Sequence, residues 1–162
     1  MAIIYCDMDG VLADFKAAAQ RTTGMSINKW MNIPSSREKW SLIKKKKDFW
    51  HTLPWMPGGK QLWSYISKHD PHILSAYVEE SFDPNCIPGK TAWLRKNTGL
   101  SNRSKINLVR RKDKKLFAKR GKPSILIDDY EKNVRDFINA GGQAIHHTNT
   151  PKTISQLKRL GF

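Results

Sequence analysis

The stretch I-I-Y-C-D-M-D-G-V-L-A-D-F, residues 3–15, places two carboxylates directly after a run of apolar residues. The apolar, β-branched and aromatic run over residues 2–6 predicts a buried strand. Burial penalises an unpaired carboxylate, so Asp7 and Asp9 call for a cation nearby. Residues two apart on an extended chain project to the same side, and Gly10 permits a sharp turn close to a ligand. The stretch therefore predicts a strand that ends in a chemical site, although a lone Asp-x-Asp can also be a turn and a helix cap.

The rest of the chain alternates between short strands and helices. Strands are predicted over 72–75, 105–109, 124–127 and 143–147, and helices over 11–20, 59–68, 84–97, 131–139 and 153–160. This alternation favours an α/β fold with a Rossmann-like parallel sheet of about five strands flanked by helices. The 162 residues suit a single domain over 1–162. Within it, residues 16–55 have a tryptophan-rich, polar texture that predicts a small helical insert.

Acidic and hydroxyl side chains stand at three of the predicted strand ends, where parallel sheets bind ligands. Asp7 and Asp9 follow the first strand, Ser75 ends the second, and Asp128-Asp129 follows the fourth. Clustered carboxylates repel one another unless a cation lies among them, and oxygen ligands favour Mg²⁺ over zinc. A lysine from residues 112–115 would complete a phosphoryl-binding site.

Several motifs carry a resemblance to a known family. D-M-D-G-V-L-A-D-F, residues 7–15, resembles the first motif of the haloacid dehalogenase (HAD) superfamily of phosphohydrolases, and within it the 5′(3′)-deoxyribonucleotidases. The segments F-W-H-T-L-P (49–54), M-P-G-G (56–59), I-L-S-A (73–76), K-T-A-W-L (90–94), D-K (113–114) and I-L-I-D-D (125–129) are similar to further motifs of that family, in its order. Ser75 stands where the second motif more commonly has threonine. The resemblance spans nearly the whole chain and implies a HAD-like fold in which the insert is a small cap.

The resemblance also implies an activity. The chain is expected to be a Mg²⁺-dependent phosphatase that hydrolyses (deoxy)ribonucleoside 5′-monophosphates through an aspartyl-phosphate. Asp7 would be the nucleophile and Asp9 the general acid and base. Asp7, the Asp9 backbone carbonyl and one acid of the fourth motif would hold Mg²⁺. The sequence leaves open whether Asp128 or Asp129 binds the metal directly.

The remaining implied site residues contact phosphate or base. Phosphate contacts are expected from Gly10, Ser75, Ala76, Lys90 and Lys114. Lys114 would also act in catalysis by neutralising charge and restraining Asp7, with Lys112 and Lys115 as alternatives. Lys90 could instead simply cap the helix region 88–97. A nucleobase would contact Phe15, Phe49 and Trp50, whose alternative role is to tie the helical insert to the core.

The charge is strongly basic, with 29 lysines and arginines against 14 acids and a net charge of +15. This excess favours anionic partners, although it can also reflect a solubilising surface. The basic stretches 44–47 and 110–122 could follow a nucleic-acid backbone. Two alternatives therefore stand beside the nucleotidase: a phosphatase for polynucleotide ends or other phosphomonoesters, and a non-catalytic HAD-like protein that binds nucleic acid.

Cysteine content and hydropathy indicate in which cellular compartment the protein is expected. Two cysteines, Cys6 and Cys86, are too few for a disulfide framework, and the apolar run before Asp7 is too short for a signal peptide. No run approaches the roughly 18 apolar residues of a membrane helix. The sequence therefore predicts a reduced, cytoplasmic protein with no membrane partner, and it leaves the oligomeric state open.

Overall fold

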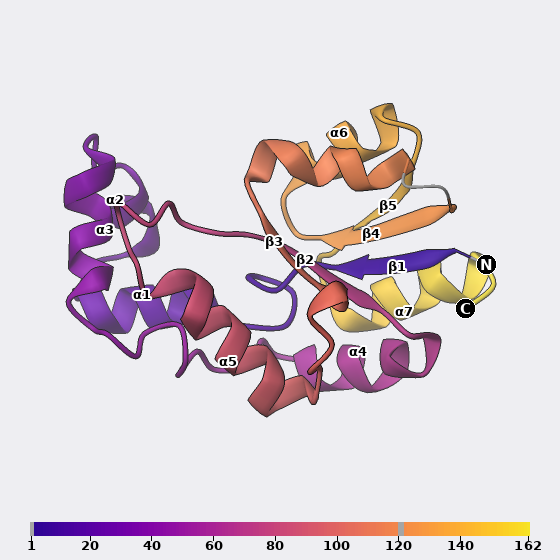
Figure 1. The fold of residues 1–162 in the computed structure, drawn as a ribbon, viewed down its shortest axis with the longest axis horizontal. Helices are drawn as coiled ribbons and strands as arrows, with labels where there is room; N and C mark the ends of the chain where they lie inside the picture. The colour runs from indigo at the N-terminus through magenta and orange to yellow at the C-terminus, as the bar shows by residue number, and fades with distance from the viewer. Residues whose placement is uncertain (1, 120–121) are drawn as a thin grey trace. The chain divides into compact units, whose positions relative to one another are not determined.

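Five parallel strands form the sheet of the computed structural model, which describes residues 2–119 and 122–162. The strands are β1 (Ile3–Cys6), β2 (His72–Ala76), β3 (Ile106–Val109), β4 (Ser124–Asp128) and β5 (Gln143–His146). Their order is β3-β2-β1-β4-β5, with every neighbouring pair parallel (Figure 1). The predicted α/β fold is confirmed. Arg120 and Gly121, which belong to the basic stretch 110–122, lie outside the described residues.

The chain divides into two compact units, described here one at a time. The sheet unit comprises residues 1–13, 55–76 and 102–162, and the helical unit comprises residues 14–54 and 77–101. The helical unit therefore draws on two segments, one after β1 and one after β2. Among the described residues, no helix has the length and apolarity needed to span a bilayer.

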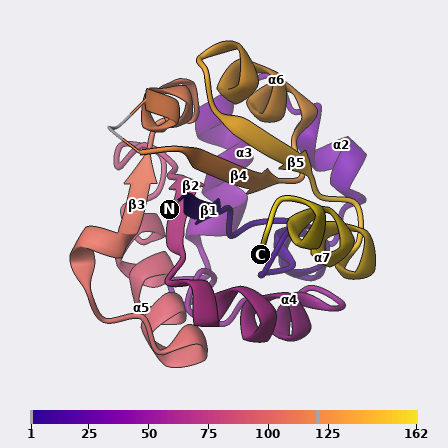
Figure 2. The same cartoon turned by 90° about the vertical axis from the view of Figure 1, so that its right-hand side faces the viewer.

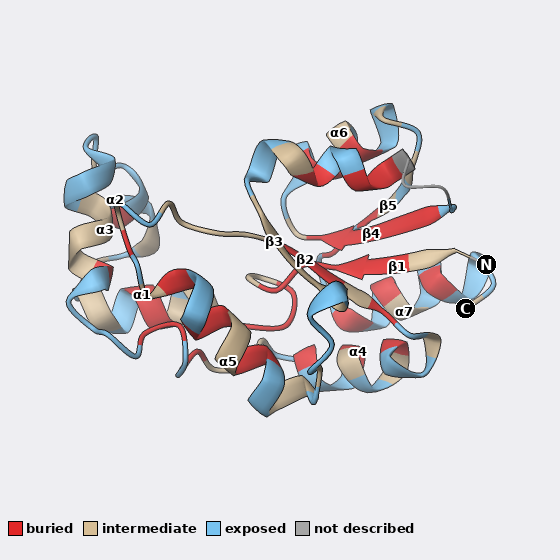
Figure 3. Cartoon of the chain, viewed as in Figure 1, coloured by how far each residue is buried: buried red, intermediate tan, exposed pale blue. Residues whose placement is uncertain are grey.

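Helices cover both faces of the sheet. The sheet unit contains α4 (Gly59–Ile66), α6 (Glu131–Asn139), α7 (Thr150–Arg159) and the 3-10 helices η1 (Ser67–His69), η2 (Arg103–Lys105) and η3 (Arg111–Lys119). Both α6 and η3 lie over one face, and α4 and α7 lie over the other (Figures 1 and 2). The central strands are buried along most of their length (Figure 3), as their continuous apolar sequences predict.

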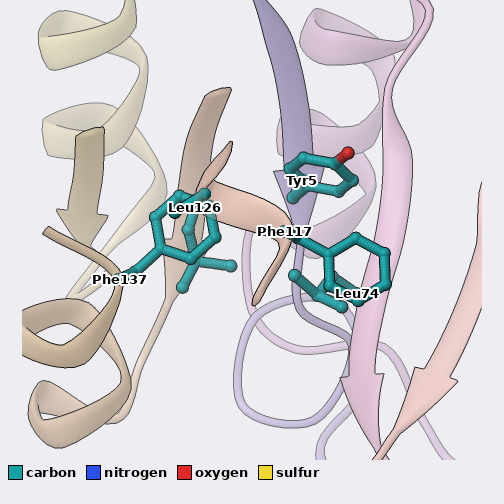
Figure 4. Packing of buried hydrophobic residues seen from close by; sticks show 6 residues of the cluster. Tyr5, Leu74, Phe117, Leu126 and Phe137 are labelled. Atoms are coloured by element: carbon teal, nitrogen blue, oxygen red, sulfur yellow. The ribbon is translucent and has the colours of Figure 1, made fainter. Parts of the chain in front are cut away.

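One core cluster fixes the position of η3. Tyr5, Leu74 and Leu126 project from three adjacent strands and pack against Phe117 of η3 and Phe137 of α6 (Figure 4). The Tyr5 and Phe117 rings meet edge to face with centroids 5.5 Å apart. Residues three apart share a face of a 3-10 helix. The anchoring of Phe117 therefore turns residue 114 toward the sheet as well.

The helical unit has an aromatic core. It contains α1 (Phe15–Thr23), α2 (Ile27–Met31), α3 (Ser36–Lys44) and α5 (Cys86–Thr98). Its aromatic side chains pack with ring centroids 5.0 to 6.1 Å apart and come from Phe15, Trp30, Trp40, Phe49 and Trp50. A buried hydrogen bond from Trp50 Nε1 to Asp83 Oδ2, 2.8 Å long, ties segment 77–101 into this core.

The helix predicted over 11–20 begins later than expected. Leu12 and Ala13 donate their backbone N–H groups to the carbonyl of Met8, which closes a tight turn. The Asp14 side chain then caps α1 by accepting a hydrogen bond from Ala17 N, at 3.1 Å. The prediction is therefore wrong for residues 11–14, because the apolar residues 11–13 are buried in a turn rather than on a helix face.

Candidate active site

Acids from two distant motifs meet at the carboxyl ends of β1 and β4. Cys6 pairs with Ile127 across these strands, and Asp7 N donates to Ile127 O at 2.9 Å, so Asp7 lies beside Asp128. Asp7, Asp128 and Asp129 each offer a carboxylate oxygen, and these oxygens lie within 4.8 Å of one another. The strand order reverses between β1 and β4, which is where open α/β sheets bind their ligands.

One lysine lies within this acid cluster. Lys114 Nζ is 3.1 Å from Asp7 Oδ1 and 2.8 Å from Asp128 Oδ2, and the side chain is buried. Burial acts to lower the pKa of Lys114, but the two carboxylates outweigh it and the pKa is raised. Lys114 is therefore a fixed positive charge, whereas the alternatives Lys112 and Lys115 are exposed.

The two acids of the fourth motif have different surroundings. Asp128 is fully buried. Besides the Lys114 contact, its Oδ2 accepts a hydrogen bond from Asn133 Nδ2 at 3.1 Å, and its Oδ1 accepts one from Tyr130 N at 2.9 Å. The Asp129 carboxylate has no hydrogen bond to another residue's side chain within the described part of the chain. The protein scaffold therefore fixes Asp128 and leaves the Asp129 carboxylate available to a ligand.

Burial and neighbouring negative charge raise the pKa of both of these acids. Burial, reinforced by the Asp7 charge, raises the pKa of Asp128 to about 6 despite the opposing effect of Lys114. Burial, together with the charges of Asp7 and Asp128, raises the pKa of Asp129 to about 7. Three carboxylates converge beside the single ammonium of Lys114, so the cluster carries more acidic groups than this lysine neutralises.

The cluster could hold a metal ion. Three converging carboxylates with no histidine or cysteine among them are the hard oxygen donors that Mg²⁺ prefers, and a divalent cation would offset their excess negative charge. The carboxylate of Asp9 is not a member of this group. Asp9 is half-buried in the turn after β1, and its expected contribution through the backbone carbonyl stays a prediction.

Gly10 lets the turn approach Asp129 closely. Its φ is +81°, and a Cβ built on it would lie 2.1 Å from Asp129 Oδ2. A side chain here would therefore displace the Asp129 carboxylate as well as strain the backbone.

We expect Gly10→Ala to weaken metal binding at least about tenfold, because the added Cβ displaces the Asp129 carboxylate. A tenfold loss of affinity corresponds to about 1.4 kcal/mol of binding free energy. Gly24→Ala is a matched control, because Gly24 has φ +70° at the end of α1 and an added Cβ meets nothing within 4 Å. Both variants should lose about 1 to 2 kcal/mol of stability from the backbone conformation. Only Gly10→Ala should lose Mg²⁺ affinity in titration calorimetry, and equal affinities in the two variants would contradict this role.

The predicted phosphate contacts Ser75 and Ala76 end β2 at the same edge of the sheet. Ile73 pairs with Cys6, so Ser75 lies two residues beyond that pair on the strand next to β1. Its side chain is buried, at 1% exposure. The structure thus places Ser75 at the level of the acid cluster, and its contact with phosphate stays a prediction.

Four predicted site residues lie in the helical unit. Phe49 and Trp50 are 1% exposed and belong to the aromatic core, and Phe15 stacks on Trp50 with centroids 5.5 Å apart. Lys90 on α5 is also buried, with its Nζ 5.2 Å from the centroid of a Trp50 ring. For the three aromatic residues, these contacts are the packing that the sequence left as an alternative to base contact. Base and phosphate contacts by these four residues stay predictions.

Two further residues contact the motif-four acids and were not predicted. Asn133, in the first turn of α6, directs its amide back to Asp128. His146 on β5 places Nε2 3.0 Å from the backbone oxygen of Asp129. An asparagine in the first turn after an Asp-Asp strand end is a signal that could have indicated Asn133. The His146 contact depends on the pairing of β4 with β5.

Comparisons with known proteins bear on the fold. No family model matches the sequence, and no curated protein is detectably similar to it. A hydrolase from Streptococcus pneumoniae TIGR4 aligns over 96% of this chain and 97% of its own, with 11% identity and a TM-score of 0.57. L-2-haloacid dehalogenase from Xanthobacter autotrophicus aligns over 100% and 84%, with 12% identity and a TM-score of 0.58.

A third solved structure carries ligands. A HAD family enzyme from Bacteroides thetaiotaomicron, in complex with magnesium and inorganic phosphate, aligns over 97% of this chain and 98% of its own. Its identity is 15% and its TM-score 0.53. Because all three identities are low, the similarity establishes architecture alone. The chain has the haloacid dehalogenase-like fold.

Proposed function

We propose that the protein is a Mg²⁺-dependent phosphatase that hydrolyses (deoxy)ribonucleoside 5′-monophosphates to nucleoside and phosphate. One observation carries the phosphatase assignment: the buried Asp7 carboxylate lies beside Asp128, Asp129 and the ammonium of Lys114. The Bacteroides thetaiotaomicron enzyme of the same fold, solved with magnesium and phosphate, supports the metal and the reacting group. The nucleotide part rests on the resemblance of the motifs to the deoxyribonucleotidases.

The proposed reaction has two steps. An Asp7 carboxylate oxygen attacks phosphorus, the bond from phosphorus to the ester oxygen breaks, and the leaving nucleoside oxygen takes a proton from Asp9. Water then attacks the aspartyl-phosphate and gives a proton to Asp9, and the bond between phosphorus and Asp7 breaks. The enzyme returns to its starting state with inorganic phosphate released.

Lys114 has two tasks in this scheme. Its contact with Asp7 Oδ1 holds the nucleophile in place, and its charge attracts the phosphoryl oxygens. Bound Mg²⁺ would reduce the repulsion between the Asp7 carboxylate and the anionic phosphate. Asp7 and Asp129 are the carboxylates we expect to hold it, since Asp128 already accepts hydrogen bonds at both oxygens.

We expect Asp129→Asn to cost more metal affinity than Asp128→Asn. Asp129→Asn removes a charged ligand, and its apparent Mg²⁺ affinity should fall by more than about 100-fold, because even the loss of a residue that only orients a ligand costs about 10- to 100-fold. The Asp128→Asn variant should instead lose stability, because the buried Lys114 loses a partner. Calorimetric titration with Mg²⁺ and urea unfolding separate the two effects. The reverse ranking of affinities would assign the direct ligand to Asp128.

A second candidate, a phosphatase for nucleic-acid ends, is favoured by the surface of η3. Arg111, Lys112 and Lys115 are exposed on the helix that supplies Lys114. Arg111 stands one 3-10 turn before Lys114, and its guanidinium carbon lies 5.0 Å from the Tyr130 ring centroid. These cations could attract phosphates beyond the one that is hydrolysed.

A phosphate-release screen with Mg²⁺ tests both candidates. Its panel contains nucleoside 5′- and 3′-monophosphates, sugar phosphates and oligonucleotides with a 5′- or 3′-terminal phosphate, each at low and high salt. The leading proposal predicts the highest kcat/KM on nucleoside 5′-monophosphates, with little effect of Arg111→Ala. Preference for oligonucleotide ends, lost at high salt and in Arg111→Ala, would support the second candidate. No release from any substrate would favour a non-catalytic role.

A further inference from the structure

A basic groove lies entirely within residues 18–52 of the helical unit. Its volume is about 600 Å³, within the size range of ligand-binding pockets. Six of its nine lining residues are charged or carry a hydroxyl group: Arg21, Thr22, Thr23, Lys45, Lys46 and Thr52. Ala18, Leu42 and Phe49 form its apolar part. The phosphatase reaction proposed above uses none of the charged groups of this groove.

The cations of the groove form no ion pair with an acid of residues 2–119 or 122–162. Arg21, Lys45 and Lys46 are exposed, and no ion pair with a carboxylate involves them in the part of the chain that the structure describes. Asp14, the acid nearest Arg21 in sequence, is occupied as the cap of α1. Residues 14–54 contain nine lysines and arginines and only three acids. The groove is therefore a region of uncompensated positive charge.

The groove also offers a hydrogen-bond donor. Thr23 Oγ1 donates to Ala19 O at 2.7 Å, and Thr52 Oγ1 donates to Asp48 O at 2.9 Å. Thr22 makes no side-chain hydrogen bond within the described residues, so its hydroxyl remains available to a ligand. Uncompensated guanidinium and ammonium groups beside a hydroxyl donor suit phosphate oxygens.

We propose that this groove binds the phosphodiester backbone of single-stranded nucleic acid. The charge extends beyond the groove, because Lys44 and Lys47 flank Lys45 and Lys46 and are also exposed. This length of positive charge exceeds what one phosphate neutralises and suits successive phosphates along a strand. A single strand can enter a hollow of this volume, whereas a duplex presents a convex backbone. The proposal does not depend on the proposed phosphatase activity.

The groove binds without reading bases. Phe49 is the aromatic residue in its lining and is 1% exposed, so it offers no face for base stacking. Stacking is a main source of base preference in single-strand binding. Affinity should therefore come from phosphate contacts, vary little with sequence and fall steeply with salt.

Fluorescence anisotropy with labelled oligothymidine of about 12 nucleotides tests the proposal, since single-strand sites cover roughly 4 to 16 nucleotides. Both ends of the probe carry hydroxyl groups, so it has no phosphomonoester for the acid cluster. The variant is Lys45→Ala/Lys46→Ala. The control is Lys152→Ala/Lys158→Ala, which removes two exposed charges from α7 of the sheet unit. Circular dichroism confirms that both variants fold.

At low salt the Lys45→Ala/Lys46→Ala variant should bind at least about tenfold more weakly. The slope of log affinity against log salt concentration is negative, and it should become shallower by about 1.4. Each lost lysine–phosphate contact to a single strand contributes about 0.7 to the steepness of this slope. The control should change affinity less than twofold. Equal losses in both variants would show an effect of net charge alone. Competition by inorganic phosphate or a mononucleotide as strong as by oligothymidine, or equal affinity for a duplex, would also overturn the proposal.

Discussion

Replacing Asp7 with asparagine should reduce phosphate release by at least about 1,000-fold, because an amide oxygen cannot replace the carboxylate that attacks phosphorus. The loss should appear in kcat at saturating nucleotide and Mg²⁺, since the step affected is bond formation. Release of inorganic phosphate, followed over hours at high enzyme concentration, measures the residual rate. An Asp7→Asn enzyme with full activity would rule out an aspartyl-phosphate intermediate.

Two measurements separate this chemical effect from a structural one. Asp136→Asn removes a charge from an exposed pair with Lys132 on α6, and it should leave the rate within about twofold. Asp7→Asn itself should unfold at no lower urea concentration than the wild-type protein without metal. The substitution removes the Asp7 charge from the repulsion among the three acids, which makes ionisation of Asp128 and Asp129 easier. This gain in stability offsets the loss of the contact between Asp7 and Lys114.

The sheet and the acid cluster could be predicted because both depend on local patterns. Continuous apolar runs define β1, β2 and β4, and parallel pairing brings the residues after these strands to one edge of the sheet. The meeting of Asp7 with Asp128 follows from that pairing, once the strand order is the one observed. The predicted helix over 131–139 is confirmed with the same bounds, and its first residue follows the Asp128-Asp129 pair closely.

Features that depend on long-range packing could not be predicted in the same way. Three lysines crowd residues 112–115, and the choice of Lys114 follows from the phase of η3, which Phe117 sets by packing between the sheet and α6. The grouping of segment 77–101 with residues 14–54 depends on contacts such as the Trp50–Asp83 hydrogen bond. The groove depends on how α1 and the turn after α3 come together, because its cations are ordinary surface residues in sequence.

The metal-free protein should lose stability as the pH rises from about 4 to about 8, and Mg²⁺ should reverse the loss. In the folded state the pKa of Asp128 is about 6 and that of Asp129 about 7, against an ordinary value of 3.8. Between the ordinary pKa of 3.8 and the raised values, the folded state binds more protons than the unfolded state, so the free energy of unfolding falls as pH rises. Each pKa unit corresponds to about 1.4 kcal/mol, which gives a total on the order of several kcal/mol.

Metal binding has the opposite dependence on pH. Mg²⁺ needs ionised carboxylates, so it must displace the proton that Asp129 partly holds near pH 7 and the protons that both acids hold at pH 5. Its stabilising effect, which grows with ligand concentration relative to Kd, should therefore be small at pH 5 and large at pH 8. Urea unfolding at both pH values, with EDTA or with Mg²⁺, measures the difference.

The Asp129→Asn variant shows whether the cluster is the source of this behaviour. It lacks the carboxyl group with the higher of the two pKa values, so its metal-free stability should fall less between pH 5 and pH 8. It should also gain little from Mg²⁺ at either pH, because a metal ligand is missing. An exposed acid gives the contrast: Asp136→Asn should keep the full pH dependence and the full response to Mg²⁺. If Mg²⁺ stabilised the wild-type protein equally at pH 5 and pH 8, the ion would bind away from Asp128 and Asp129, and the proposed metal site would be wrong.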